Sequence, residues 1–226
     1  MARQGPRQRF FDLWSLVYDA PWVQRATYHP VHAAVLRALG RHPGARVLDI
    51  GCGTGQLTAR LARHWPDAAV VGCDFSGGML ARAAARSPEL SWVRADAGCL
   101  PFQDRSFDVI TSTEAFHWFP DQDAALAEFF RVLAPGGQLL LALVNTPARA
   151  LSDVLYAGSR VMGEPFYWPS MGEMRGRVEA AGFRVQAQRR IFRWPGLLLP
   201  PVLTHAQRPG PPQLKSVRRR AGRSNA

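Results

Sequence analysis

The chain of 226 residues has few cysteines, a single lysine and no long hydrophobic run. Its three cysteines, Cys52, Cys73 and Cys99, are odd in number and lack metal-ligand spacing, which favours reduced thiols over disulfides or a metal site. The longest apolar segment, 196–203, contains two prolines and is far shorter than the roughly 18 residues of a membrane span. The N-terminus lacks the apolar core of a secretory signal. These absences predict a cytoplasmic protein with no membrane span and no metal.

Acidic residues are absent from residues 180–226, which carry ten basic side chains. Residues 1–179 hold 17 acidic and 18 basic residues, so +10 of the net charge of +11 belongs to the C-terminal end. The arginine run at 218–220 could contact RNA or an anionic surface electrostatically. A charge run without interleaved aromatic residues is, however, more typical of a solvated tail. Because 208–226 combine proline, glycine and arginine with little apolar content, we expect a disordered basic tail there.

Between the termini, short apolar runs alternate with amphipathic segments. Residues 10–40 have a helical spacing that breaks at Pro21 and ends at Gly40, and we expect an N-terminal helical lid over residues 1–42. Continuous apolar runs predict five buried strands, at 45–50, 68–74, 90–96, 107–113 and 137–144. Amphipathic segments predict three helices, at 56–65, 76–87 and 121–134. Ser76 is the expected N-cap of the second of these helices.

The pattern weakens after the fifth strand. Residues 145–170 form an insertion, irregular or helical, that we expect to decide specificity. A helix at 171–182 and strands at 183–194 and 201–207 follow. Strands that alternate with helices indicate a parallel sheet with helices on both faces. The expected fold is therefore α/β, a doubly wound and mostly parallel seven-stranded sheet within residues 43–207.

A glycine-rich loop follows the first strand directly, in the stretch VLDIGCGTG at 47–55. Gly51, Gly53 and Gly55 leave backbone N–H groups open to a ligand between a strand and a helix N-terminus. Acidic residues lie at the ends of the first three strands: Asp49, Asp74 and Asp96. Because ligands of open α/β sheets bind at the carboxyl ends of the strands, we expect the three carboxylates to line one crevice.

Two classes of ligand compete for this loop. A dinucleotide site requires G-x-G-x-x-G, but Gln56 stands where the third glycine belongs. Asp49 would repel a pyrophosphate and suits a ligand with an ammonium or sulfonium group. Asp74 lies 19 residues after Gly55, about where an acid binds a ribose hydroxyl pair in nucleotide sites. The pattern therefore favours a positively charged ligand over a dinucleotide.

Five blocks of sequence follow in order over residues 47–142: VLDIGCGTG, VVGCDFSGGML, VRADAGCLPF, FDVITSTEAFHWF and RVLAPGGQLLL. In these blocks the chain resembles the class I S-adenosylmethionine-dependent methyltransferases. It is similar to the small-molecule branch of that superfamily, which includes the menaquinone/ubiquinone C-methyltransferases. The resemblance implies S-adenosylmethionine as the cofactor. It also implies a Rossmann-like sheet with a late antiparallel strand, for which 201–207 is the candidate.

The resemblance implies roles for individual residues of the blocks. The loop that holds the methionine part of the cofactor corresponds to Asp49, Gly51, Cys52, Gly53 and Gly55. Asp74 corresponds to the acid that bridges the ribose hydroxyls, and Thr113 faces the sulfonium side. An alternative interpretation of Asp49 is that it only caps the loop, by accepting hydrogen bonds from its N–H groups.

The adenine end of the cofactor corresponds to two further blocks. Phe75 and Met79 resemble residues that flank the adenine ring. Asp96 matches the acid that binds the adenine amino group, with the Ala97 N–H beside it. An alternative interpretation of Phe75 and Met79 is that they are core residues.

The loop STEAFHWFPD, residues 112–121, lies where the family places its methyl acceptor. His117 is the first candidate for a base that removes a proton from the acceptor, and Glu114 is the second. His117 can instead be interpreted as a tethered ring in an apolar pocket wall that includes Trp118 and its aromatic neighbours. A base is needed only when the acceptor must lose a proton, since much of the catalysis can come from positioning.

Aromatic residues in and near the acceptor loop favour a planar or hydrophobic acceptor. The candidates for its site are Tyr18 of the N-terminal lid, His117, Trp118, Phe166 and Trp168. The alternative interpretation is that these aromatic residues only pack in the core and the lid.

The sequence thus predicts methyl transfer by in-line displacement to a small organic acceptor, such as a quinone, a lipid or a secondary metabolite. Nucleic acid is disfavoured as the acceptor, because the chain has STEAF where enzymes that methylate base amino groups usually have Asn/Asp-Pro-Pro-Tyr/Phe. One alternative is an RNA or protein methyltransferase that uses the basic tail. Another is a non-catalytic cofactor-binding protein with a regulatory role. The sequence sets no oligomeric state.

Overall fold

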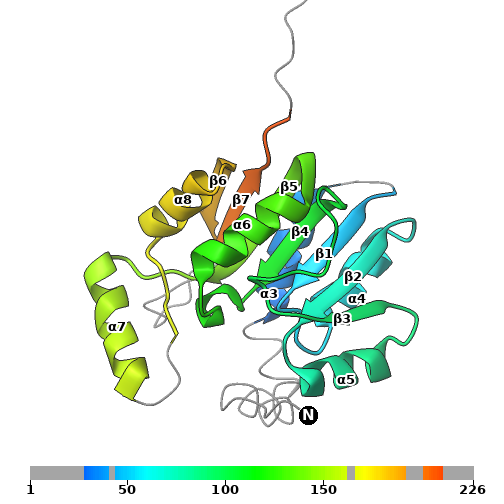
Figure 1. The fold of residues 1–226 in the computed structure, drawn as a ribbon, viewed down its shortest axis with the longest axis horizontal. Coiled ribbons are helices and arrows are strands. Elements are labelled where there is room, and N and C mark those ends of the chain that lie inside the picture. Colours follow the sequence, from blue (N-terminus) through cyan, green and yellow to red (C-terminus); the bar gives the residue numbers. More distant parts are fainter. Residues whose placement is uncertain (1–27, 41–43, 162–165, 192–200, 211–226) are drawn as a thin grey trace, which may run out of the picture.

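The computed structural model describes residues 28–40, 44–161, 166–191 and 201–210. The described part contains one seven-stranded sheet with the strand order β3-β2-β1-β4-β5-β7-β6 (Figure 1). The strands are β1 Arg46–Ile50, β2 Ala69–Asp74, β3 Ser91–Arg94, β4 Phe107–Thr113, β5 Leu133–Val144, β6 Arg184–Arg190 and β7 Pro201–Gln207. The helices are α3 His29–Leu39, α4 Gln56–His64, α5 Gly77–Arg86, the 3-10 helix η2 Phe116–Trp118, α6 Gln122–Val132, α7 Arg149–Val161 and α8 Met171–Ala180.

The sheet is parallel except around one strand. Strands β3, β2, β1, β4 and β5 pair in parallel, whereas β7 is antiparallel to both of its neighbours, β5 and β6. This confirms the predicted doubly wound, mostly parallel sheet and the late antiparallel strand. The strand order reverses between β1 and β4, and ligands of open sheets bind at such a switch point.

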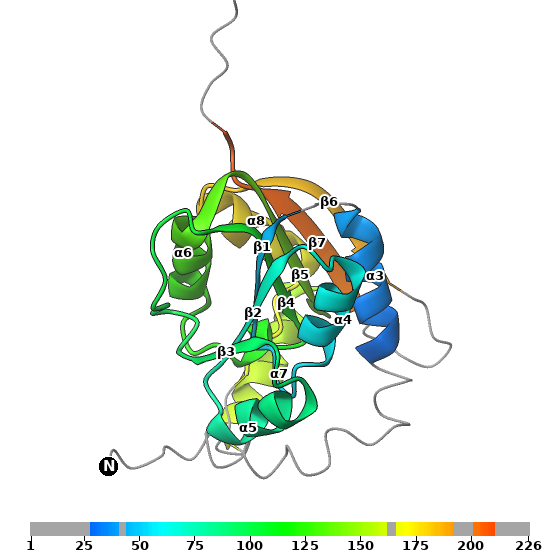
Figure 2. The same ribbon diagram turned by 90° about the vertical axis from the view of Figure 1, so that its right-hand side faces the viewer.

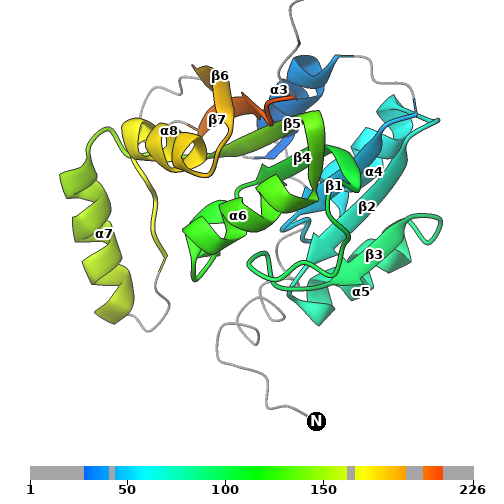
Figure 3. The same cartoon turned by 45° about the horizontal axis from the view of Figure 1, so that its top comes forward.

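Two apolar layers hold the sheet between helices. On one face, Val35 of α3 and Leu61 of α4 are fully buried against the sheet. On the other face, Phe129 of α6 and Val178 of α8 are fully buried. Figures 2 and 3 show α3 and α4 on one side of the sheet and α6 on the other, with α8 beside α6. β1 is buried along Val47–Ile50 because helices cover both of its faces, which explains its unbroken apolar run.

Two helix boundaries lie at the residues that the sequence predicts. The Ser76 hydroxyl accepts a hydrogen bond from the Met79 N–H and caps α5, as the sequence indicates. Gly40 follows α3 with φ of +63°, a conformation that suits glycine. The insertion after β5 contains α7, which stands away from the sheet in Figures 1 and 3.

The predicted boundary between α6 and β5 is wrong. The helix expected to reach residue 134 ends at Val132, because Leu133 is extended and pairs with Phe107 of β4. Pro135 also disfavours a helical conformation for the residue before it. β5 therefore begins four residues before the expected strand. Tyr18, most of the predicted lid over 1–42 and most of the predicted tail lie outside the described residues.

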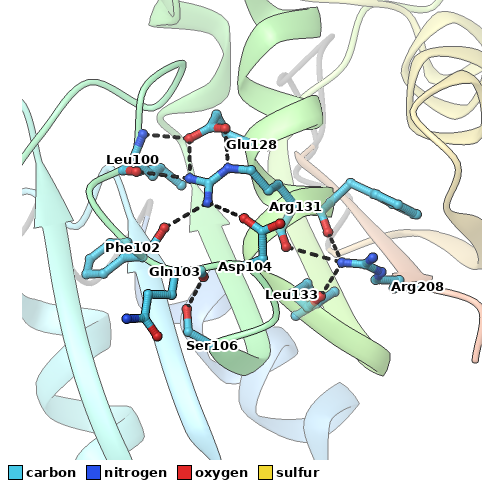
Figure 4. Close-up of polar contacts among 10 residues, drawn as sticks. Leu100, Phe102, Gln103, Asp104, Ser106, Glu128, Arg131, Leu133 and Arg208 are labelled. Carbon is cyan, nitrogen blue, oxygen red and sulfur yellow. Dashed lines mark hydrogen bonds and ion pairs between the residues drawn. The ribbon is translucent and has the colours of Figure 1, made fainter.

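Arg131 of α6 fixes the connection between β3 and β4. Its guanidinium donates to the Glu128 carboxylate, with a shortest distance of 2.6 Å, and to Asp104 Oδ1 at 2.8 Å. It also donates to the carbonyl oxygens of Leu100 and Phe102, so one side chain ties four points together (Figure 4). Hydrogen bonds to Glu128 and Asp104 raise the pKa of Arg131 above its ordinary value. This anchor holds the loop that follows the cleft residues at the end of β3.

We predict that Arg131→Gln lowers the free energy of unfolding by about 2 kcal/mol, because it removes a charge that several acceptors share. The matched control is Arg175→Gln, whose exposed pair with Glu179 should contribute less than about 0.5 kcal/mol. Urea denaturation of both variants measures the difference. Equal effects of the two substitutions would contradict the anchoring role of Arg131.

Candidate functional site

A cleft opens at the carboxyl ends of the parallel strands, where the strand order reverses. Residues that line it come from the loops after β1, β2, β3 and β4. Ten of the predicted site residues line this cleft: Gly51, Gly53, Asp74, Phe75, Met79, Asp96, Ala97, Thr113, Glu114 and Trp118. Asp49, Cys52, Gly55, His117, Phe166 and Trp168 are not among the residues that line it.

The glycine loop folds back over the end of β2. The N–H groups of Gly51 and Cys52 both donate to the Cys73 carbonyl, at 2.8 and 3.1 Å. Gly51 and Gly53 have φ values of +67° and +54°, a region that glycine adopts without strain. A Cβ atom on Gly51 would lie 2.3 Å from the Ala115 Cβ. The loop therefore needs glycine both for its conformation and for its close approach to the segment after β4.

Asp74 joins the two loops that flank the cleft. Its Oδ2 accepts a hydrogen bond from the Gly53 N–H at 2.8 Å, and its Oδ1 accepts one from the Ser76 N–H at 2.9 Å. The side chain is mostly buried but lines the cleft. The carboxylate is thus fixed at the end of β2 with one edge toward the cleft.

Asp49 lies beneath the glycine loop rather than in the cleft. Its residue is 1% exposed, and its two oxygens accept hydrogen bonds from the hydroxyls of Thr58 at 2.7 Å and Thr111 at 2.9 Å. Burial raises the pKa of Asp49 to about 6, and the two hydroxyl hydrogen bonds oppose this rise. The carboxyl group links β1 to α4 and β4. Neither threonine is predictable from the sequence as a partner of Asp49, because each has the pattern of an ordinary helix or strand residue.

The other end of the cleft has an apolar wall and a carboxylate. Phe75 and Met79 line it, and Met79 is almost completely buried. Asp96 is exposed, and its Oδ1 accepts a hydrogen bond from the Gly98 N–H at 2.8 Å. The Ala97 backbone lies beside it in the same wall. This combination suits a flat ring with a polar edge.

Glu114 has an unusual backbone and an unusual carboxyl group. Its φ of +51° lies in the left-handed region, and its N–H donates to the Ala142 carbonyl at 2.7 Å. Its Oε1 is buried without a hydrogen-bond partner, although the residue lines the cleft. Burial raises the pKa of Glu114 to about 7, opposed by a hydrogen bond from the Val144 N–H. Strained backbone of this kind concentrates at functional sites.

His117 lies in an aromatic cluster behind the cleft. Its ring centroid is 5.2 Å from that of Trp118 and 5.5 Å from that of Trp168, and Phe166 packs edge-on against it. Burial lowers the pKa of His117 to about 3, so its imidazole is neutral near pH 7. Its Nδ1 is buried without a hydrogen-bond partner. The structure therefore brings three predicted acceptor-site residues around His117 but separates His117 from the cleft.

A short segment, 166–170, is held beside this cluster by hydrogen bonds to its backbone. The Tyr167 N–H donates to the His117 carbonyl at 2.9 Å, and Gln122 Nε2 donates to the Tyr167 carbonyl at 2.9 Å. Asn145 Nδ2 donates to the Pro169 carbonyl at 2.7 Å. Sequence reasoning missed both amides, because a glutamine at the start of a helix and an asparagine after a strand usually face solvent.

A groove adjoins the cleft beside this segment. Phe119 and Pro120 line both the cleft and the groove. His117, Gln122 and Tyr167 line the groove but not the cleft. The Gln122 Oε1 is buried without a partner, like the His117 Nδ1. The groove is also lined by Tyr156 and by the charged residues Asp121, Asp123 and Arg177. The two unpartnered polar atoms are buried behind this lining.

Known proteins resemble this chain in sequence. A family model described as "Methyltransferase domain" matches residues 47–137. A demethylmenaquinone methyltransferase of Beutenbergia cavernae is 43% identical over 145 residues, which are 64% of this chain and 56% of that protein. One from Streptomyces avermitilis is 31% identical over 200 residues, 80% of this chain and 82% of that protein. The chain belongs to the class I S-adenosylmethionine-dependent methyltransferases.

Solved structures agree with this family in fold. Phosphoethanolamine N-methyltransferase 2 of Haemonchus contortus, in complex with S-adenosyl-L-methionine, has a TM-score of 0.74 at 18% identity and covers 90% of this chain and 58% of that one. The [4+2]-cyclase SpnF has a TM-score of 0.71 at 20% identity, covering 90% and 96%. The methyltransferase chain spans 56% and 63% of the length of the first two curated relatives. S-adenosylmethionine is the cofactor of this family.

Two further findings concern the described part of the methyltransferase. No helix there is long and apolar enough to cross a bilayer. No group of three or more histidine, cysteine, aspartate or glutamate side chains there could hold a metal ion.

We predict that Gly51→Ala lowers the free energy of unfolding by about 3 kcal/mol or more, because strain at positive φ adds to a clash with Ala115. Gly136→Ala is the matched control, since Gly136 has φ of +83° and open space around its Cα. The control should cost only the strain, about 1–2 kcal/mol. Chemical denaturation separates the two contributions, and equal losses would exclude the close contact.

Proposed function

We propose that this chain transfers a methyl group from S-adenosylmethionine to a small organic acceptor in the cytoplasm, through a domain over residues 43–207. The observation that carries the proposal is the cleft, where a glycine loop, two carboxylates and an apolar wall meet at the carboxyl ends of the strands. The cofactor supplies an electrophilic methyl group on a sulfonium. The residues present fit such a molecule, because the glycine loop admits a close ligand and the cleft combines an apolar wall with acidic groups.

We assign the parts of the cleft as follows. Gly51 and Gly53 would bind the methionine part through their backbone, and Asp74 would accept hydrogen bonds from ribose hydroxyls. Asp96 and the Ala97 N–H would bind the adenine edge, beside the apolar wall. Asp49 would act indirectly, by holding β1, α4 and β4 beneath the loop through its two threonine partners.

We place the base at Glu114 rather than at His117. Glu114 lines the cleft and has a pKa near 7, so it is largely ionised just above neutral pH and can take a proton from the acceptor. His117 is separated from the cleft by its neighbours, and its low pKa makes it a weak base. The bound cofactor would supply the methyl group, and the Glu114 carboxylate would take the proton that the acceptor loses.

We place the acceptor in the groove that adjoins the cleft. Tyr156 and Tyr167 supply aromatic surface, and Asp121, Asp123 and Arg177 supply groups that can hydrogen-bond a polar substituent. Such a lining suits a planar molecule with a hydroxyl or carbonyl group, and a quinone or its reduced form fits this description. Two of the relatives named above are demethylmenaquinone methyltransferases, which supports the same choice.

Calorimetric titration with S-adenosylhomocysteine tests the cofactor assignment. We expect Asp74→Ala to weaken binding by about 100-fold, because two hydrogen bonds to a carboxylate are lost. Asp74→Asn keeps one acceptor oxygen for the loop and should fold normally, with an intermediate loss. Asp67→Ala removes an exposed carboxylate just before the amino end of β2, away from the cleft, and should bind like the wild type. A folded wild-type protein that binds neither this compound nor S-adenosylmethionine would refute the proposal.

Glu114→Gln should reduce turnover by about 100-fold or more while leaving binding of S-adenosylhomocysteine unchanged. It should also stabilise the protein as the pH rises. The pKa of Glu114 is about 7 in the folded protein and ordinary in the unfolded chain, so the wild type loses stability between about pH 4.5 and pH 7. The glutamine variant lacks this loss. Thermal unfolding at pH 5 and pH 8 measures it, and a variant that is less stable than the wild type at pH 8 would contradict the buried-carboxyl account.

A further inference from the structure

A second groove lies between α3 and the edge of the sheet, on the face opposite α6 and α8. Helix α3 packs over β7, β5 and β4, and a strip of β6 and β7 remains beside it. The floor of this strip is aliphatic: Ala34, Ala38, Ala187, Ile191 and Leu203. Ala187 lies within β6, and Ile191 directly follows the strand.

Arginines surround this floor. Arg37 lies in the last turn of α3, and Arg189 and Arg190 end β6; all three are exposed and line the groove. None of the three forms an ion pair with the described residues. The elements that build the groove, α3, β6 and β7, contain no aspartate or glutamate. As far as the structure describes the chain, the groove is therefore basic and has no acidic residue on the elements that build it.

The opposite face behaves differently. Arg131, Arg175 and Arg177 of α6 and α8 each pair with a carboxylate within 3.0 Å. The contrast is not a simple consequence of arginine number, since both faces carry several arginines. Three arginines that form no ion pair with the described part of the chain surround one aliphatic strip, which indicates a surface that meets negative charge from outside.

The groove is separate from the cofactor cleft. The strand register aligns Thr113 with Ala142, Ala142 with Leu203, and Leu203 with Arg189. Three spacings between neighbouring strands place the Arg189 backbone about 14 Å from that of Thr113. A partner in the groove could thus sit beside the reacting centre without filling the cleft.

We propose that this groove binds an acidic, amphipathic segment of a partner protein. Aliphatic side chains of the segment would cover the floor, and its carboxylates would pair with Arg37, Arg189 and Arg190. A polypeptide supplies both kinds of group at spacings that match the groove. Single-stranded nucleic acid binds by stacking its bases on aromatic rings, and none of the residues that line this groove carries one except the imidazole of His205. A flat membrane surface would meet the arginines but would not fill the hollow floor.

The test uses the full chain and a fluorescein-labelled peptide with glutamate and leucine at helical spacing. Binding is measured by fluorescence anisotropy at an ionic strength of about 0.15 M. Arg37→Gln/Arg189→Gln/Arg190→Gln should weaken binding by about tenfold or more. The matched control, Arg63→Gln/Arg160→Gln/Arg175→Gln, removes the same charge elsewhere and should change binding less than about twofold. Ala34→Glu tests the floor and should weaken binding as the groove triple does.

Each outcome decides the proposal. Loss confined to the groove variants, with no binding of the corresponding lysine–leucine peptide, supports it. Equal losses of peptide affinity in the groove variant and the control variant would show that only net charge matters, and would overturn the proposal. Absence of peptide binding by the wild type, or stronger groove-dependent binding of single-stranded DNA or phosphatidylglycerol vesicles, would also overturn it. Binding of S-adenosylhomocysteine, measured in parallel, should be unchanged in all variants, so that failure of this proposal and failure of the methyltransferase proposal are distinguished.

Discussion

The cleft depends on the way the chain turns back over the carboxyl end of β2. The Cys73 carbonyl accepts two N–H groups of the glycine loop, and the Asp74 carboxylate accepts one N–H from each of the two flanking loops. Backbone groups rather than loop side chains make these contacts, which leaves the loop surface free of side-chain bulk. A rigid loop with a bare surface can let a ligand approach the backbone closely, and the glycines are the residues that permit both properties.

Two buried carboxyl groups near this loop differ in their surroundings. Asp49 has a hydroxyl donor on each side and does not line the cleft. Glu114 lines the cleft with its Oε1 unpartnered, and burial raises its pKa to about 7. The first arrangement suits a structural tie between β1, α4 and β4. The second leaves a group that can gain or lose a proton near neutral pH, which is the property that proton transfer requires.

Local sequence signals predicted the sheet well because each strand is buried by its own neighbours. The unbroken apolar runs of β1 and β2 follow from helices on both faces, and the caps at Ser76 and Gly40 follow from backbone chemistry within a few residues. The end of α6 was not predictable in the same way. Pairing of Leu133 with Phe107, 26 positions earlier, overrides the helical pattern of its own segment.

In the candidate site, too, residues placed by local motifs were predictable and residues placed by long-range contacts were not. Ten of its predicted residues line the cleft because a short motif places them at consecutive strand ends. The surroundings of His117 depend on residues 166–170, about 50 positions later, which no local pattern connects to it. Burial of that ring follows only from this long-range contact, and with it the low pKa that separates His117 from Glu114 as a base.

Acidic residues are distributed unevenly over the described helices. Helices α3, α4 and α5 contain no acidic residue, whereas α6 and α8 contain two each, placed to pair with arginines. Packing does not require this division, because both helical layers bury similar aliphatic surfaces against the same sheet. Neutralised arginines fasten α6 to the loop after β3 and α6 to α8, so their charges act within the protein. The arginines around the α3 groove form no ion pair with the described residues, so their charge is available to a partner.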